Sequence, residues 1–160
     1  MARLAGLNAA VLEDSARTAI AAVASFLVAR LLRMPEAYWA TISTLIVMQS
    51  TLGAALTISW QRLAGTVLGA AAGAVLSRYF HANLVMFGLG VFALGLFCEA
   101  VGLKTSFRFA GVTLAIVMLI AREQPAWIVA EHRFIEVSVG IAVALALTAV
   151  WPLRDSNAAA

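Results

Sequence analysis

Six apolar runs, each close to the length of a membrane-spanning helix, constrain the fold of this chain more than any other feature. They cover residues 15–32, 37–55, 62–80, 82–101, 106–121 and 133–152. Crossing the hydrocarbon core of a bilayer takes about 20 mostly apolar residues in a helix. The breaks between the runs are short, so successive helices must run antiparallel. We therefore expect an all-α, multi-pass membrane protein with six transmembrane helices.

The composition excludes several other classes of protein. Hydrophobic residues make up 63% of the chain and charged residues 12%, whereas a soluble domain carries about 25% charged residues. The net charge of +3 is spread along the chain and forms no basic patch of the kind that binds nucleic acid. The expected surroundings are a lipid bilayer, and no nucleic-acid partner is expected.

The flanks of the six runs are assigned separately. Residues 1–14 form either an interfacial helix or a polar tail, and residues 153–160 form a C-terminal tail, which leaves 15–152 as the transmembrane domain. Glu13 and Asp14 directly precede the first apolar run, which is the wrong charge for a signal peptide. Arginine and lysine divide almost equally between the two sides, so the positive-inside rule does not set the orientation.

A stripe of small residues marks the third run. Gly65, Gly69 and Gly73 recur every fourth residue and so lie on one face of a helix, where they let a second helix approach closely. The partner is either another helix of the same chain or a second copy of it. We expect a homodimer or a higher homo-oligomer, for which this stripe is one candidate seam.

The two halves of the chain also share a pattern. Ile46-Val47-Met48 precedes Arg62, and Gly69 follows that arginine by seven positions. Ile116-Val117-Met118 precedes Arg133 at nearly the same distance, and Gly140 follows that arginine by seven. Three spans per copy would place the copies in opposite membrane orientations, as in the inverted repeats of transporters. A 3+3 inverted repeat is therefore one interpretation of the six spans, and chance similarity between apolar segments is the other.

A family resemblance rests on three motifs. They are the pair Tyr38-Trp39, the segment Val47-Met48-Gln49-Ser50-Thr51-Leu52-Gly53, and the segment Arg62-Leu63-Ala64-Gly65-Thr66-Val67-Leu68-Gly69. In this combination the chain resembles the membrane domain of the fusaric acid resistance and aromatic acid exporter superfamily. The resemblance implies efflux of small organic anions, especially aromatic carboxylic acids, across a bacterial inner membrane. Many members carry a second module or a soluble domain, so an accessory or scaffold subunit of a larger efflux assembly is the alternative.

The candidate substrate site follows from the chemistry of a carboxylate. Guanidinium groups bind carboxylates in a bidentate manner, so Arg62 is the principal candidate and Arg133 its counterpart. We expect Arg62 to open the third span, where the helix dipole favours an anion; the competing interpretation is a lipid-facing anchor. The further candidates are Tyr38, Trp39 or Phe107 as stacking surfaces, with Gln49 from the polar break and Arg108 from the fifth span.

Two acids are candidates for proton coupling. Glu99 ends the fourth span and Glu136 lies near the start of the sixth, and acids inside membranes often carry protons. A local ion pair of Glu136 with Arg133 or His132 is the alternative. Because no motif for metal binding or nucleophilic catalysis occurs, we expect no enzyme activity, no metal and no cofactor.

Overall fold

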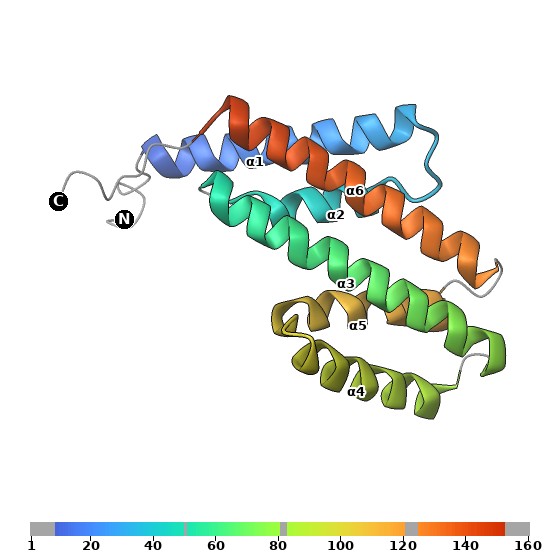
Figure 1. Cartoon of the computed structure of the whole chain (residues 1–160). Helices are drawn as coiled ribbons and strands as arrows, with labels where there is room; N and C mark the ends of the chain where they lie inside the picture. Colours follow the sequence, from blue (N-terminus) through green and yellow to red (C-terminus); the bar gives the residue numbers. More distant parts are fainter. Residues whose placement is uncertain (1–8, 50, 81–82, 121–124, 153–160) are drawn as a thin grey trace, which may run out of the picture. The chain divides into compact units, whose positions relative to one another are not determined.

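A computed structural model describes residues 9–49, 51–80, 83–120 and 125–152. Within them the chain forms six α-helices: α1 (Ala9–Leu31), α2 (Tyr38–Val47), α3 (Leu52–Tyr79), α4 (Leu84–Ala100), α5 (Phe107–Ala115) and α6 (Ala126–Val150) (Figure 1). A 3₁₀ turn, η1 (Lys104–Ser106), precedes α5, and a π-helical segment, η2 (Ile116–Ile120), follows it. The predicted all-α fold is confirmed for these residues.

The described chain divides into two compact units. Unit 1 comprises residues up to 58 together with those from 139 onward, and unit 2 comprises residues 59–138. Helices α1 and α2 belong to unit 1, and α4 and α5 belong to unit 2, whereas α3 and α6 contribute residues to both.

The second predicted span is wrong as a continuous helix. Helix α2 ends at Val47, because Met48 leaves the helical region with ψ 108°, and α3 starts at Leu52. The polar break at Gln49 and Thr51 thus separates two helices, while Ser50 lies outside the described residues. The third and sixth spans also begin earlier than predicted, at Leu52 and Ala126.

One described helix, α6, is long and apolar enough by length and composition to cross a membrane. Helices α2 and α4 are apolar but shorter. Helix α1 has 23 residues but carries several charged side chains, among them Glu13, Asp14, Arg17 and Arg30. Helix α3 has 28 residues, with Gln61, Arg62 and repeated glycines within its apolar sequence.

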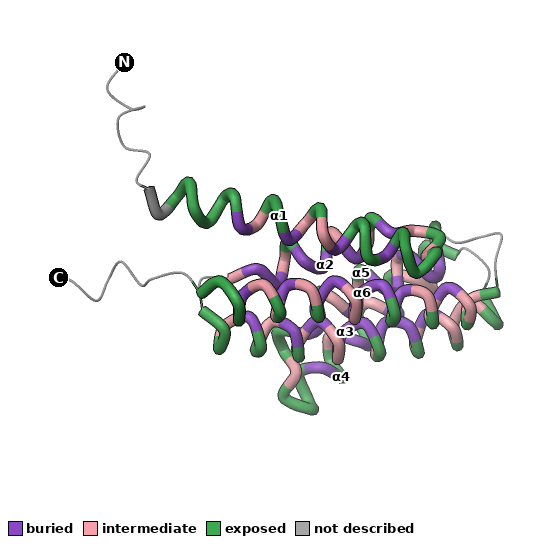
Figure 2. The backbone as a smooth tube through the Cα atoms, turned by 90° about the horizontal axis from the view of Figure 1, so that it is seen from above, coloured by how far each residue is buried: buried purple, intermediate pink, exposed green. Residues whose placement is uncertain are grey.

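Helix α1 packs against α2 through a narrow stripe of buried residues. Ala21, Ser25 and Ala29 recur every fourth position and are small and buried, and the buried Arg17 continues the stripe one turn earlier, while much of the helix is exposed (Figure 2). Ala29 forms a small core with Ala37 and Ala40 of the following turn and helix. Since alanines lack bulky side chains, the two helix backbones of unit 1 lie close together.

In unit 2 the glycine stripe of α3 packs against η1, α5 and η2. A Cβ atom added at Gly69 would lie 2.2 Å from the carbonyl oxygen of Ala110, and one at Gly73 would lie 2.8 Å from the Cβ atom of Val117. Leu94, Ala110, Leu114 and Met118 form the adjacent apolar core. The stripe therefore packs against other helices of the same chain, which is one of the two alternatives that the sequence left open.

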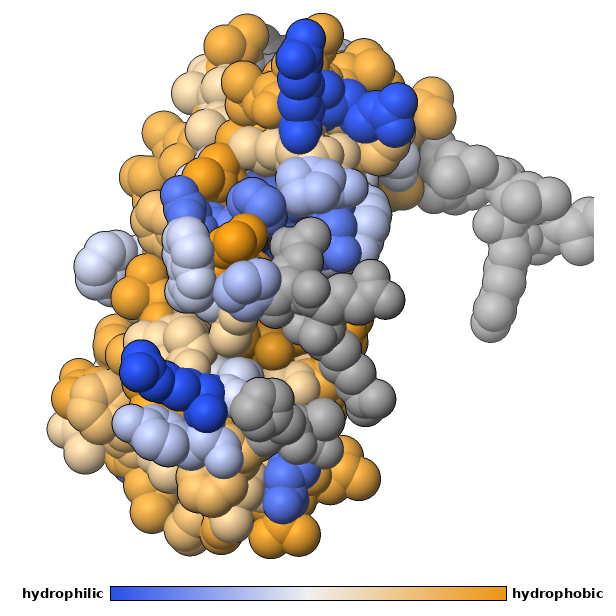
Figure 3. All heavy atoms as spheres, turned by 90° about the vertical axis from the view of Figure 1, so that its right-hand side faces the viewer, coloured by the Kyte–Doolittle hydropathy of each residue, from blue (hydrophilic) through white to orange (hydrophobic). Residues whose placement is uncertain are grey.

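Large apolar side chains remain exposed on most helices. Val23, Leu27 and Leu31 of α1 and Phe92 and Leu96 of α4 are more than half exposed. On the face drawn in Figure 3 the hydrophilic side chains form separate patches among hydrophobic ones. A surface this rich in exposed apolar residues suits contact with lipid or with other protein.

The predicted flanking segments lie largely outside the described residues. Residues 1–8 and 153–160 are not described, so the C-terminal tail and most of the predicted interfacial segment are not tested. Residues 9–14 belong to α1.

Candidate functional site

Arg62 lies in the interior of α3, where it is 5% exposed. Its guanidinium carbon lies 5.2 Å from the centroid of the Phe109 ring, on α5, a distance typical of a cation–π contact. The prediction that Arg62 opens its helix is wrong, because α3 begins ten positions earlier at Leu52. The helix dipole acts within the first turn and so adds nothing at Arg62.

Arg133 and Glu136 form a buried ion pair in the first half of α6. Their side chains approach to 3.2 Å between a guanidinium nitrogen and a carboxylate oxygen, and the two residues are 3% and 0% exposed. The local pairing that the sequence left as one alternative is therefore present. The pair lies in the third turn of α6 rather than at its start, because the helix begins at Ala126.

The aromatic candidates lie in unit 1. Tyr38 and Trp39 open α2 with ring centroids 5.7 Å apart, and Tyr38 is 49% exposed while Trp39 is partly buried. The Gln49 side chain donates to the carbonyl oxygen of Ile46 at 3.3 Å. These three residues belong to a different unit from Arg62 and Arg133, and their role in substrate binding stays a prediction.

The remaining candidates are exposed. Arg108 lies in the first turn of α5 with its side chain on the surface. Glu99, near the end of α4, is also exposed and forms an ion pair with Lys104. No described contact in unit 2 joins Arg108 or Glu99 to another predicted site residue. Phe107, the third stacking candidate, is partly buried and packs against the apolar core around Leu94 and Leu114, and its role in substrate binding stays a prediction.

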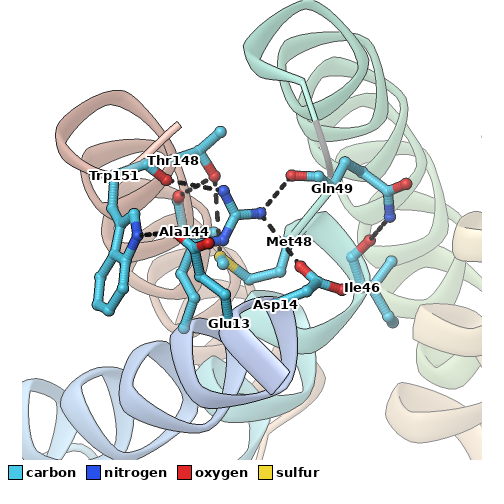
Figure 4. A network of polar contacts seen from close by, with 9 residues as sticks. Glu13, Asp14, Ile46, Met48, Gln49, Ala144, Thr148 and Trp151 are labelled. Atoms are coloured by element: carbon cyan, nitrogen blue, oxygen red, sulfur yellow. Dashed lines mark hydrogen bonds and ion pairs between the residues drawn. The ribbon is translucent and has the colours of Figure 1, made fainter. Parts of the chain in front are cut away.

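Arg17 is a buried arginine that the sequence analysis did not single out. Its guanidinium donates to the backbone carbonyl oxygen of Gln49 at 2.6 Å and to that of Trp151 at 2.9 Å, and Asp14 lies 3.6 Å away (Figure 4). Gln49 directly follows the C-cap of α2, and Trp151 directly follows α6. Arg17 thus supplies donors beside the ends of two helices, where the last carbonyl groups lack partners within the helix.

Phe109 was also missed, although a signal for it was present in the sequence. The spacing that relates Ile116-Val117-Met118 to Ile46-Val47-Met48 also relates Phe109 to Trp39. Reading the repeat through to this position would have added Phe109 to the aromatic candidates. In the predicted repeat, the Phe109 ring beside Arg62 would be the counterpart of Trp39.

The fold and its apolar surface define an α-helical membrane protein with buried charged residues inside its helices. The chain belongs to the fusaric acid resistance protein-like family, whose model matches residues 21–147. The family resemblance inferred from the motifs is thereby confirmed.

Two curated relatives were found. The chain is 32% identical over 135 residues to a protein named uncharacterized transporter YdhK from Escherichia coli strain K12, and to its counterpart in Escherichia coli O157:H7. The match covers 78% of this chain and 20% of each relative, so the chain spans about a fifth of the length of the relatives it matches. No solved structure matches the chain.

Proposed function

We propose that this chain forms a transport module for small organic anions, with aromatic carboxylic acids as the preferred class and efflux across a bacterial inner membrane as the direction. The observation that carries the proposal is the position of Arg62, buried within a largely apolar helix with its guanidinium over the ring of Phe109. An aromatic acid has a carboxylate and a ring, and this site offers a partner for each. The guanidinium binds the carboxylate, and the Phe109 ring stacks on the ring of the acid.

The burial of Arg62 inside a helix supports a functional role. Arg62 lies ten positions after the start of α3 and is 5% exposed. Burying an ionisable residue at such a position is costly and typically marks a substrate or ion pathway.

Six spanning helices arranged as a 3+3 inverted repeat fit the element order, with α1–α3 as one copy and α4–α6 as the other. Two helix crossings support the repeat. An added Cβ at Gly69 would meet the carbonyl oxygen of Ala110 at 2.2 Å within unit 2, and one at Gly140 would meet that of Ala40 at 2.2 Å within unit 1. In both cases the partner helix also presents the Cβ of a hydroxyl residue three positions on.

The middle helix of each proposed copy is short. Helix α2 has ten residues and α5 has nine before the π-helical segment. Short or interrupted helices at corresponding positions of two repeats are the best pointer to a transporter's binding site. Trp39 near the start of α2 and Phe109 near the start of α5 are thereby favoured as contacts of the transported anion.

Glu136 is the proposed proton carrier. Its ion pair with Arg133 is buried, and a proton bound by the carboxylate would release the arginine for an anionic substrate. One proton would then move with, or against, each anion. Glu99 is the weaker candidate because it is exposed and paired with Lys104.

A homo-oligomer remains part of the proposal, with exposed apolar faces other than the glycine stripe as its interface. The second candidate function, which the family resemblance left open, is an accessory or scaffold subunit that transports nothing alone. Purified chain in liposomes tests the two: the transport proposal expects uptake of 4-hydroxybenzoate above that of empty liposomes. Equal rates, with correctly inserted protein, would favour the accessory role.

A further inference from the structure

A hollow of about 300 Å³ lies beside the turn that joins α1 to α2, within unit 1. Its polar lining comes from Arg30, Arg33 and Tyr38, and its apolar lining includes Phe26, Met34 and Pro35. This volume is at the lower end of the range for small-molecule sites. The hollow therefore suits a compact ligand with one charged end and one apolar end.

The backbone at Arg33 is unusual for an arginine. Its φ of 56° lies in the left-handed region. The N–H of Arg33 donates to the carbonyl oxygen of Arg30 at 3.0 Å, and the N–H of Met34 donates to that of Ala29 at 3.0 Å. This is the helix-ending turn in which glycine is strongly preferred, because glycine has no Cβ atom.

A second turn of the same construction shows what this position needs structurally. After α4, the N–H of Gly102 donates to Glu99 at 3.2 Å and the N–H of Leu103 donates to Cys98 at 2.7 Å. Gly102 has a φ of 76°. A glycine is therefore sufficient to form this turn. The arginine at position 33 adds a conformational cost that the fold does not require. Such outliers concentrate at binding sites.

The charge of the hollow is positive. The guanidinium carbon of Arg30 lies 5.9 Å from the centroid of the Phe26 ring, which helps to hold the cation in place. Among the described residues, neither Arg30 nor Arg33 forms an ion pair with an acidic side chain. Two cations three positions apart, next to apolar walls, attract an oxyanion.

We propose that this hollow binds an oxyanion group, carboxylate or phosphate, attached to an apolar body. Arg30 and Arg33 hold the anion, and Phe26 contacts the apolar part; Tyr38 belongs to the same lining. A free aromatic acid and the head group of an anionic phospholipid both present this chemistry. The proposal concerns binding at a site separate from Arg62, and it stands whether or not the chain transports anions.

The test uses the full chain purified in detergent, with Arg33→Gly and Arg33→Gln as the variants. Arg33→Gly should raise the thermal midpoint, because it relieves the backbone, and should weaken anion binding by roughly tenfold or more, as expected for a lost charged hydrogen bond. Arg33→Gln should weaken binding similarly without the gain in stability. Arg78→Gln, which alters an exposed arginine in the last turn of α3 in the other unit, is the control and should change neither.

Two probes distinguish the sources of the anion. Benzoate binding is measured in an Arg62→Gln background, so that the Arg62 site does not contribute to the measured affinity. Retention of phosphatidylglycerol is measured by native mass spectrometry. Loss of either signal in both Arg33 variants supports the proposal and identifies the source as a free acid or a lipid. Wild-type affinity for both probes in Arg33→Gly, or no binding of either by the parent chain, would overturn it.

Discussion

The guanidinium of Arg17 donates a 2.6 Å hydrogen bond to the backbone carbonyl oxygen of Gln49, which lies directly after the C-cap of α2. A second bond, of 2.9 Å, reaches Trp151 after α6. One side chain of α1 therefore hydrogen-bonds to the backbone that follows α2 and to the backbone that follows α6. Because Arg17 is fully buried, its loss would leave these carbonyl groups without a charged donor.

Replacing Arg17 by methionine should consequently destabilise the protein. Each hydrogen bond from a charged group contributes about 1.5–3 kcal/mol, so the two bonds together predict a loss of at least about 3 kcal/mol. The measurement is the thermal midpoint in detergent, with Arg78→Met as a matched control at an exposed arginine. Equal midpoints for the two variants would mean that the Arg17 bonds do not stabilise the fold.

Alanine at Gly69 or at Gly140 should be strongly destabilising. The added Cβ would lie 2.2 Å from a backbone carbonyl oxygen in each case, and forcing atoms into a packed contact costs about 1–3 kcal/mol or more. Gly88→Ala is the control, since nothing lies within 4 Å of a Cβ atom there. Alanine should even stabilise that helical position by about 0.5–1 kcal/mol.

The thermal midpoint also tests the proposed repeat through these glycine variants. If the two crossings are equivalent, Gly69→Ala and Gly140→Ala should lower the midpoint by similar amounts. A midpoint for Gly69→Ala as high as that of Gly88→Ala would show that the close packing of α3 on α5 is wrong.

Glu136→Gln should remove the pH dependence of anion flux if this carboxylate carries the coupled proton. Arg133→Met alone should also lower stability, because breaking a buried ion pair costs about 3–5 kcal/mol. The double variant should regain part of that loss. Flux that keeps its wild-type pH profile in Glu136→Gln would exclude Glu136 as the proton carrier.

Reporter fusions test the proposal of six spans. Reporters placed in successive breaks, including the one near residue 50 and the one near residue 81, should alternate between the two sides of the membrane. These two positions flank α3, whose residues 52–79 form one helix. Finding both reporters on the same side would contradict a spanning α3.

The sequence predicted the all-α class and the number of α-helices found among the described residues, because both depend on local composition. It missed the end of α2 at Val47, since Met48 is apolar and the carbonyl of Gln49 is satisfied by Arg17, a residue 32 positions away. The sequence placed the starts of α3 and α6 too late, because apolar runs were used to define the spans. Thr57 and Trp60 in α3 and Glu131 in α6 are polar or interfacial residues and were therefore left outside the runs. Helices extend past such residues when the backbone can continue its hydrogen bonds.

Only part of the candidate site could be predicted from the sequence. The motif containing Arg62 was visible, and the pairing of Arg133 with Glu136 followed from their spacing of three positions on a helix. The contact of Arg62 with Phe109 was not visible, because it joins α3 to α5 across a tertiary contact. The role of Arg17 was hidden for the same reason, since its partners are backbone atoms that carry no sequence signal.

The central claim is that Arg62 binds the transported anion, and binding of 4-hydroxybenzoate by Arg62 variants tests it most directly. A charged hydrogen bond contributes about 1.5–3 kcal/mol, so Arg62→Gln should weaken binding by roughly ten- to a hundredfold. Arg62→Lys keeps the charge but loses the planar fork and should recover only part of the affinity. Arg78→Gln should bind like the parent chain. If Arg62→Gln and Arg78→Gln bind the acid equally well while both insert and fold, Arg62 is not the anion-binding residue.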